Sequence, residues 1–157
     1  MRVLGIDPGY DRLGAAIIER EGGKEAVLFS TCLITNKKDD LPERYLYLGK
    51  ELKKLIKKYQ PNTLAIEKLF FTNNKKTASQ VSEVRGMIIY LAADQGLNIF
   101  EYTPLEIKTT VAGFGQADKK QVADMVKQLV HLDEIRRHDD EYDAIAVALT
   151  ALARERF

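Results

Sequence analysis

Three short apolar segments lie within the first 34 residues of the chain, and their close spacing constrains the fold more than any other feature. They cover Val3–Ile6, Leu13–Ile18 and Ala26–Ile34. Asp7-Pro8-Gly9 separates the first two segments and Gly22-Gly23 separates the last two, and both are turn sequences. Connections this short join antiparallel strands, because parallel strands need a crossover of a dozen or more residues. The N-terminal part therefore predicts an antiparallel, three-stranded meander.

The rest of the chain alternates between helical and extended patterns. Beyond the first three strands, the predicted elements are a helix over Tyr45–Tyr59, a strand over Thr63–Ile66, a helix over Thr77–Gln95, a strand over Asn98–Tyr102, helices starting near Thr103 and Asp118, and a last helix over Asp140–Arg154. The two middle helix starts are marked by capping sequences. We therefore expect an α/β fold with a five-stranded mixed sheet, in which strands 1–3 are antiparallel and helices flank both faces.

The length and composition fit a single domain over residues 1–157. No stretch approaches the ~20 apolar residues that a membrane span needs. The one cysteine, Cys32, cannot form an internal disulfide, and no Cys/His cluster suggests zinc, so we expect a cytoplasmic protein. The net charge is only +1, but the lysines occur in pairs, which either bind phosphates locally or are simply solvated helix faces.

Four acidic residues occupy positions where ligands gather in α/β folds. Asp7 ends the first strand, Glu67 ends the fourth, and Asp140 and Asp143 lie three residues apart at the start of the last helix. Clustered carboxylates repel one another unless cations neutralise them, and oxygen ligands without thiols favour Mg²⁺ or Mn²⁺. Two such ions about 3.5–4 Å apart can activate water and stabilise the leaving oxygen in phosphodiester hydrolysis.

Each acid also has a purely structural explanation. Asp7 can form an Asx turn, and Glu67 can pair with a nearby lysine. Asp139 and Asp140 can cap a helix. Asp143 fits such an explanation less well, because an apolar run follows it directly.

Ordered motifs along the chain resemble the RuvC family of bacterial Holliday-junction resolvases. They are VLGIDPG at 3–9, LAIE at 64–67, Phe70, QVSEVRG at 80–86, IFEY at 99–102, KTTVAGFG at 108–115, ADKKQV at 117–122 and DEYDAIAVAL at 140–149. The resemblance covers essentially the whole chain. It implies an RNase H-like fold and a metal-dependent endonuclease that resolves Holliday junctions in recombination and repair.

The resemblance also implies a role for individual residues. The positions that match the family's metal-binding catalytic acids are Asp7, Glu67, Asp140 and Asp143, and those that match its DNA-binding residues are Phe70, Lys108 and Lys119. Phe70 matches an aromatic that meets bases at the crossover, and the lysines match contacts to the scissile backbone. Two alternatives stay open: Asp139 also fits, at i, i+4 to Asp143, and Phe71 is as aromatic as Phe70.

The family resemblance further implies two Mg²⁺ ions per active site, with Mn²⁺ able to replace them. It implies a homodimer that nicks two strands of a four-way DNA junction symmetrically, with the dimer contact on the helix over Thr77–Gln95, and cooperation with the RuvA and RuvB branch-migration proteins. Two other functions remain in view. One is a related RNase H-like nuclease acting on another branched DNA or on structured RNA, and the other is a non-catalytic junction-binding module.

Overall fold

The predicted meander is present and forms one half of a five-stranded sheet. The computed structural model describes residues 1–69, 75–130, 132 and 138–155. Its strands are β1 (Arg2–Asp7), β2 (Arg12–Glu21), β3 (Lys24–Ile34), β4 (Thr63–Glu67) and β5 (Asn98–Tyr102). Its helices are α1 (Leu41–Tyr59), α2 (Lys75–Asp94), α3 (Pro104–Ala112), α4 (Lys119–Leu129) and α5 (Asp139–Arg154).

The sheet is mixed, with the strand order β3-β2-β1-β4-β5. β1 pairs antiparallel with β2, and β2 pairs antiparallel with β3, as the short turns predict. β1 pairs parallel with β4, and β4 pairs parallel with β5, which places the carboxyl ends of these three strands at one edge. The predicted five-stranded mixed sheet with an antiparallel meander is therefore confirmed.

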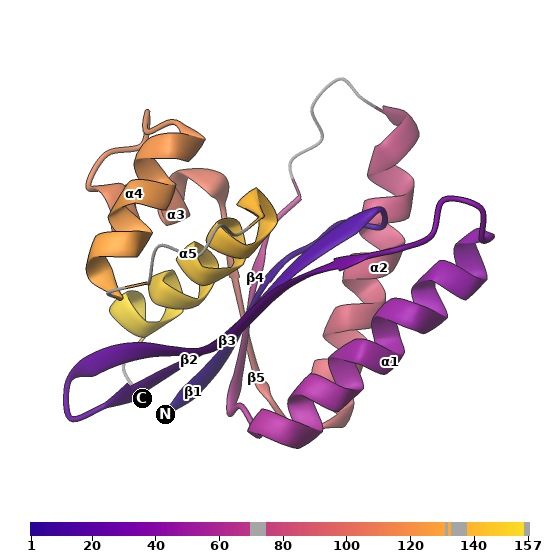
Figure 1. Cartoon of the computed structure of the whole chain (residues 1–157), viewed down its shortest axis with the longest axis horizontal. Helices are drawn as coiled ribbons and strands as arrows, with labels where there is room; N and C mark the ends of the chain where they lie inside the picture. Colours follow the sequence, from indigo (N-terminus) through magenta and orange to yellow (C-terminus); the bar gives the residue numbers. More distant parts are fainter. Residues whose placement is uncertain (70–74, 131, 133–137, 156–157) are drawn as a thin grey trace.

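Helices cover both faces of the sheet, and each face has its own apolar core (Figure 1). Alternate residues of β1 supply the two cores, since Val3 faces α3, α4 and α5, whereas Leu4 and Ile6 face α1 and α2. Within the described ranges, every helix is too short or too polar to cross a bilayer.

The first helix and the hairpin strands begin or end at other residues than the sequence predicts, for identifiable reasons. α1 begins at Leu41 rather than Tyr45, because Asp40 caps it by accepting a hydrogen bond from the Glu43 amide at 2.9 Å. β2 and β3 extend to the hairpin turn at Gly22 and Gly23, whose φ angles of 59° and 80° require residues that tolerate the left-handed region.

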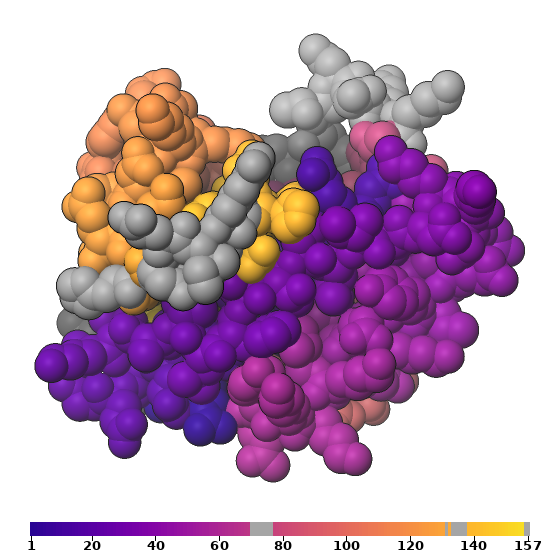
Figure 2. Space-filling view, viewed as in Figure 1, coloured from indigo at the N-terminus to yellow at the C-terminus, as the bar shows by residue number. Residues whose placement is uncertain are grey.

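The last helix lies unusually close to the sheet, and two glycines permit this approach. A Cβ atom at Gly5 of β1 would clash with the backbone oxygen of Ala144, and one at Gly14 of β2 would clash with the backbone oxygen of Asp140. Gly14 is also the cross-strand neighbour of Asp7. The first turn of α5 therefore rests directly above the carboxyl end of β1. Figure 2 shows α5 in the recess between α4 and the β2–β3 strands.

Candidate active site at the carboxyl ends of β1 and β4

A cavity of about 280 Å³ lies where β1 and β4 end, bounded by α3, α4 and α5. Its charged lining residues are Asp7, Glu67, Lys108, Lys119 and Asp143. Apolar walls from Ile107, Val122 and Val147 close its sides. Three of the four predicted catalytic acids and both predicted lysines therefore share one cavity.

The sheet and α5 explain why residues so distant in sequence meet here. β1 and β4 run in parallel with Ile6 beside Ile66, so the acids that follow, Asp7 and Glu67, lie at the same edge. Asp143 lies one turn into α5, on the helix that the glycines seat against β1 and β2. The geometry follows from strand pairing and close packing rather than from any local sequence contact.

The acids of the cavity strongly disfavour one another's ionised forms. Burial raises the pKa of Asp7 to about 7, and the negative charges of Asp143, Glu67 and Asp140 add to the effect. Burial and the charge of Asp143 also raise the pKa of Glu67. The Nζ atom of Lys119 lies 2.9 Å from Asp143 Oδ2 and partly offsets this repulsion. A site that pushes the pKa of an aspartate to neutrality needs additional positive charge when the acid ionises.

Asp140 lies at the margin of this group rather than in the lining of the cavity. Its charge contributes to the raised pKa of Asp7, while its Oδ2 accepts a hydrogen bond from Cys32 Sγ at 3.6 Å and lies 3.8 Å from Arg12 Nε. Burial and the nearby Asp140 raise the pKa of Cys32 to about 11, so its thiol remains protonated and can donate. Asp139 lines a neighbouring cavity between α4 and α5, and the charge that raises the pKa of Asp7 is that of Asp140, which favours Asp140 as the partner of Asp7.

The set of donors suits a hard divalent cation, because it consists of carboxylates and lacks thiolates. Among the residues that the structure describes, no three acids, histidines or cysteines are gathered tightly enough to form a complete metal-binding group. Asp143 forms an ion pair with Lys119, and Asp140 accepts a hydrogen bond from Cys32. The fit to a hard cation therefore rests on the type of donor and on Asp7 and Glu67, which follow the paired residues Ile6 and Ile66 at the same sheet edge.

Two arginines that sequence reasoning missed support the strand ends. Arg85 of α2 donates to the backbone oxygen of Glu67 at 3.2 Å and forms an ion pair with Glu101 of β5. Arg44 of α1 is buried, pairs with Asp11 and donates to the backbone oxygen of Tyr10 at 3.1 Å, which fixes the turn after β1. Arg85 lies within the QVSEVRG motif, which was its only sequence signal, whereas Arg44 had none.

The predicted lysines lie in the cavity, whereas the predicted aromatic cannot be placed. Lys108 comes from α3 and Lys119 from the first turn of α4, and their positive charges partly offset the rise in the pKa of Glu67. Phe70 and its alternative Phe71 lie outside the described residues.

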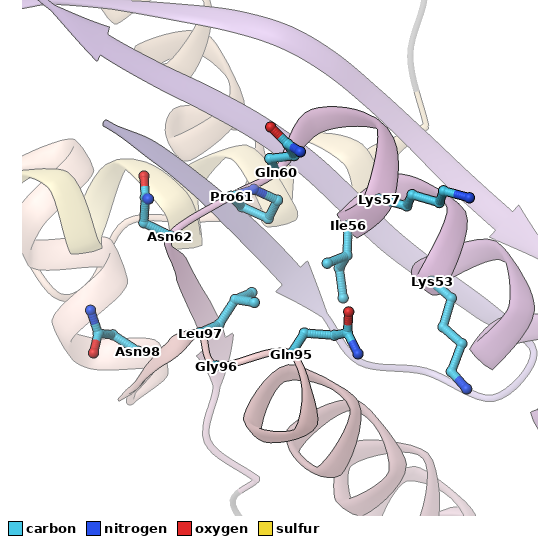
Figure 3. A pocket seen from close by; sticks show the side chains of 10 residues that line it. All are labelled: Lys53, Ile56, Lys57, Gln60, Pro61, Asn62, Gln95, Gly96, Leu97 and Asn98. Atoms are coloured by element: carbon cyan, nitrogen blue, oxygen red, sulfur yellow. The ribbon is translucent and has the colours of Figure 1, made fainter.

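A second cavity, of about 800 Å³, lies at the opposite end of the sheet (Figure 3). It opens between the last turn of α1 and the turn from α2 to β5. Its polar lining residues are Lys53, Lys57, Gln60, Asn62, Gln95 and Asn98. It contains no carboxylate among these residues, so the cation chemistry belongs to the cavity at Asp7.

Comparisons with known proteins agree with this geometry. Residues 3–151 match the family model described as "Crossover junction endodeoxyribonuclease RuvC". A protein of that name from Finegoldia magna is 43% identical over all of this chain and 96% of its own length. Another from Thermosipho melanesiensis is 41% identical over the full length of both.

The fold has the same counterpart among solved structures. A structure titled "T. thermophilus RuvC in complex with Holliday junction substrate" matches with a TM-score of 0.91 and 30% identity, over 98% of this chain and 93% of that one. The mixed sheet with its flanking helices is accordingly an RNase H-like fold. On the family model, the full-length relatives and the shared architecture, this chain belongs to the RuvC family of crossover junction endodeoxyribonucleases.

Proposed function

We propose that this chain is a divalent-metal-dependent endonuclease that resolves four-way DNA junctions by paired, symmetrical nicks. The observation that carries the proposal is the cavity that joins Asp7, Glu67 and Asp143 with Lys108 and Lys119. Support comes from membership of an endonuclease family and from similarity over 98% of the chain to a protein solved with a Holliday junction substrate.

Asp7, Glu67, Asp140 and Asp143 are the residues that would hold Mg²⁺, with two ions per site and Mn²⁺ as a substitute. When bound, such cations supply Lewis-acid chemistry for phosphodiester hydrolysis. The raised pKa of Asp7 means that this side chain is protonated in part of the metal-free population near neutral pH. Its carboxylate becomes available as the pH rises through about 7, so cation binding should strengthen over the same range.

Lys108 and Lys119 are positioned to hold the phosphate. Both ammonium groups line the cavity that contains the acids, and Lys119 is bonded to Asp143. With a divalent cation held by the acids, the Lys119 ammonium would lie beside an anionic phosphate oxygen, where it would oppose the developing negative charge. Ile107, Val122 and Val147 line the same cavity beside the acids, whereas the Lys119 side chain is 76% exposed and can reach an incoming phosphate from solvent.

Lys119→Ala should lower the single-turnover cleavage rate of a four-way junction by about 10²–10³-fold, because it removes a fixed cation beside the reacting phosphate. Rapid-quench gels at saturating enzyme measure this rate. Lys120→Ala is the matched control, since Lys120 is the next residue of α4 but does not line the cavity. Equal losses in the two variants would contradict a specific role for Lys119.

The substrate class is tested with a mobile four-way junction, a linear duplex of the same sequence and an RNA–DNA hybrid, each incubated with Mg²⁺. Labelling each strand in turn shows where the nicks fall. The proposal predicts nicks at matching positions on two strands of the junction and little cleavage of the other substrates. Preferential cleavage of the hybrid would instead favour the related RNase H-like nuclease, and binding without cleavage would favour a junction-binding module.

Paired nicking requires two active sites, and α2 offers the surface for a homodimer. Tyr90 is 66% exposed, and a Cβ atom at Gly86, four residues earlier on the same helix, would meet open space. A small residue beside an exposed aromatic allows a second helix to approach closely, and a two-fold axis would pair this face with itself. α2 is the helix to which the family resemblance assigns the dimer contact, over Thr77–Gln95.

Tyr90→Arg should convert the dimer into a monomer, because it places a charge at the centre of the proposed contact. Analytical ultracentrifugation at micromolar concentration measures the change. Leu46→Arg is the matched control, since Leu46 is an exposed apolar residue (58%) of a different helix, α1. Dissociation by Leu46→Arg rather than Tyr90→Arg would place the dimer contact elsewhere.

Three further assignments complete the proposal. Phe70 would meet bases at the junction crossover, where base–aromatic stacking is worth about 1–3 kcal/mol per base. RuvA and RuvB would be the branch-migration partners, and the cytoplasm would be the site of action. Each follows from the family to which the chain belongs.

A further inference from the structure

The edge strand β3 is tied to the first turn of α5 by two side chains on the same strand face. Ser30 Oγ donates a hydrogen bond to Glu141 Oε2 at 2.7 Å. Cys32, two residues further along β3, reaches Asp140 Oδ2 at 3.6 Å. Residues two apart in a strand point to the same side of a sheet, so both contacts fall on one helical turn.

Glu141 is the stronger anchor of this turn. The residue is only 9% exposed, and its second carboxylate oxygen, Oε1, accepts from the His138 amide at 3.3 Å. A buried carboxylate is costly unless its oxygens are bonded, so the hydroxyl of Ser30 and the amide of His138 restrict where Glu141 can lie. Glu141 stands between Asp140 and Asp143 in the sequence and does not line the cavity itself.

The neighbouring strand leaves room for this connection. Ser30 lies opposite Ala16 of β2, and Cys32 lies opposite Gly14. Both β2 residues are small and fully covered by α5. α5 can therefore pack closely against β2, and its first turn lies within hydrogen-bonding distance of β3, the next strand of the sheet.

We propose that Ser30 and Glu141 are positioning residues that set the orientation of the first turn of α5 and thereby the placement of Asp140 and Asp143 for the divalent cation. This inference rests on the proposed function, because it assumes that these two aspartates bind metal. Residues that orient metal ligands change metal affinity by about 10–100-fold when they are removed. Ser30 would act through Glu141 and the helix backbone, without contacting the cation or the substrate.

The test compares Ser30→Ala with Ser30→Thr and Thr31→Ala in the full-length protein. Ser30→Thr keeps the hydroxyl, and Thr31→Ala removes a hydroxyl from the next residue of β3, on the opposite strand face. Mn²⁺ binding without DNA is followed by the electron paramagnetic resonance signal of free Mn²⁺. Thermal unfolding of the metal-free protein and the Mg²⁺ concentration that half-saturates junction cleavage are measured for each variant.

Ser30→Ala should weaken Mn²⁺ binding about 10-fold and raise the half-saturating Mg²⁺ concentration by a similar factor. Ser30→Thr should restore both values to within about threefold of the original protein, and Thr31→Ala should leave them unchanged. If Ser30→Ala lowers the unfolding temperature but leaves Mn²⁺ binding and Mg²⁺ dependence intact, Ser30 is merely structural and the inference is wrong.

Glu141→Gln provides a second probe that does not depend on how Ser30→Ala folds. Its single oxygen can still accept from the His138 amide while its Nε2 donates to Ser30 Oγ, so both contacts can persist without the negative charge, and its Mn²⁺ defect should be smaller than that of Ser30→Ala. A larger defect would show that the charge of Glu141 matters rather than its position. If the unaltered protein fails to cut a four-way junction in Mg²⁺, the proposed function itself fails, whereas cleavage with unchanged metal binding in Ser30→Ala defeats only the positioning role.

Discussion

Asp7→Asn is expected to abolish nicking of a four-way junction in Mg²⁺, while the variant still binds the junction and the metal-free protein becomes more stable. The rate should fall by at least about 10³-fold, because Asp7 interacts with the other three acids and its removal disables the group as a unit. Junction binding should persist because Lys108 and Lys119 remain in the cavity.

The stability gain follows from the pKa of Asp7, which burial and three like charges raise to about 7 from an ordinary value of 3.8. Between these two pH values the folded protein binds more protons than the unfolded chain, so the free energy of unfolding falls as the pH rises and levels off above about 7. At about 1.4 kcal/mol per pKa unit, the ionised carboxylate costs the metal-free fold up to about 4 kcal/mol at pH 8. An asparagine carries no such cost.

Urea unfolding in EDTA at pH 4 and pH 8 measures this effect. Asp7→Asn should be more stable than the unaltered protein at pH 8, and the difference should shrink towards pH 4. Asp94→Asn serves as the control, because Asp94 is exposed at the end of α2 and its loss should change neither quantity. If the Asp7→Asn variant still cuts the junction, or is no more stable than the unaltered protein at pH 8, the central role assigned to Asp7 is wrong.

Gly14→Val is expected to destabilise the protein by at least about 3 kcal/mol and to disable metal binding at the same time. Overpacking of a side chain alone costs about 1–3 kcal/mol, and here the added atoms meet the backbone of Asp140, which cannot turn aside. α5 would have to lift from β2, and Asp140 and Asp143 would move away from Asp7 with it.

Thermal and urea unfolding measure the stability of Gly14→Val, and Mn²⁺ titration measures the site. Gly22→Asn is the matched control, because Gly22 lies in the β2–β3 hairpin with open space at its Cβ position and a positive φ that asparagine tolerates. It should leave stability within about 0.5 kcal/mol of the original. Original stability and metal affinity in Gly14→Val would refute the role of the glycine in seating α5.

Much of the fold could be predicted from the sequence because it follows from local patterns. The short turns at Pro8-Gly9 and Gly22-Gly23 predicted the antiparallel half of the sheet, and the capping boxes at Thr103 and Asp118 predicted two helix starts. The start of α1 was missed because its cap, Asp40, precedes the helical periodicity by five residues.

The site was predictable only in part, because its supporting contacts join residues far apart in the chain. Asp7 and Glu67 follow from strand ends, and Asp143 from its place on α5, so the sequence located them. No spacing rule connects Ser30 with Glu141, which are separated by 111 positions. Arg44 lies 34 positions from Tyr10, in the turn that it holds.

The raised pKa of Asp7 links the structural and the chemical parts of this account. Burial destabilises the ionised carboxylate when no metal is bound. The same burial strengthens the attraction between that carboxylate and a bound cation. The ion pair between Lys119 and Asp143 supplies part of that positive charge within the protein. The clustered acids thus lower the stability of the metal-free fold and raise its affinity for a cation, as acidic clusters at functional sites commonly do.

Anomalous X-ray scattering from crystals of the protein with a junction DNA and Mn²⁺ shows whether Asp7 and Glu67 bind the same divalent cation. We expect manganese density within about 2.5 Å of carboxylate oxygens from both Asp7 and Glu67, with Asp140 or Asp143 completing the group. Manganese bound elsewhere on the protein, with Asp7 and Glu67 free of it, would contradict the account.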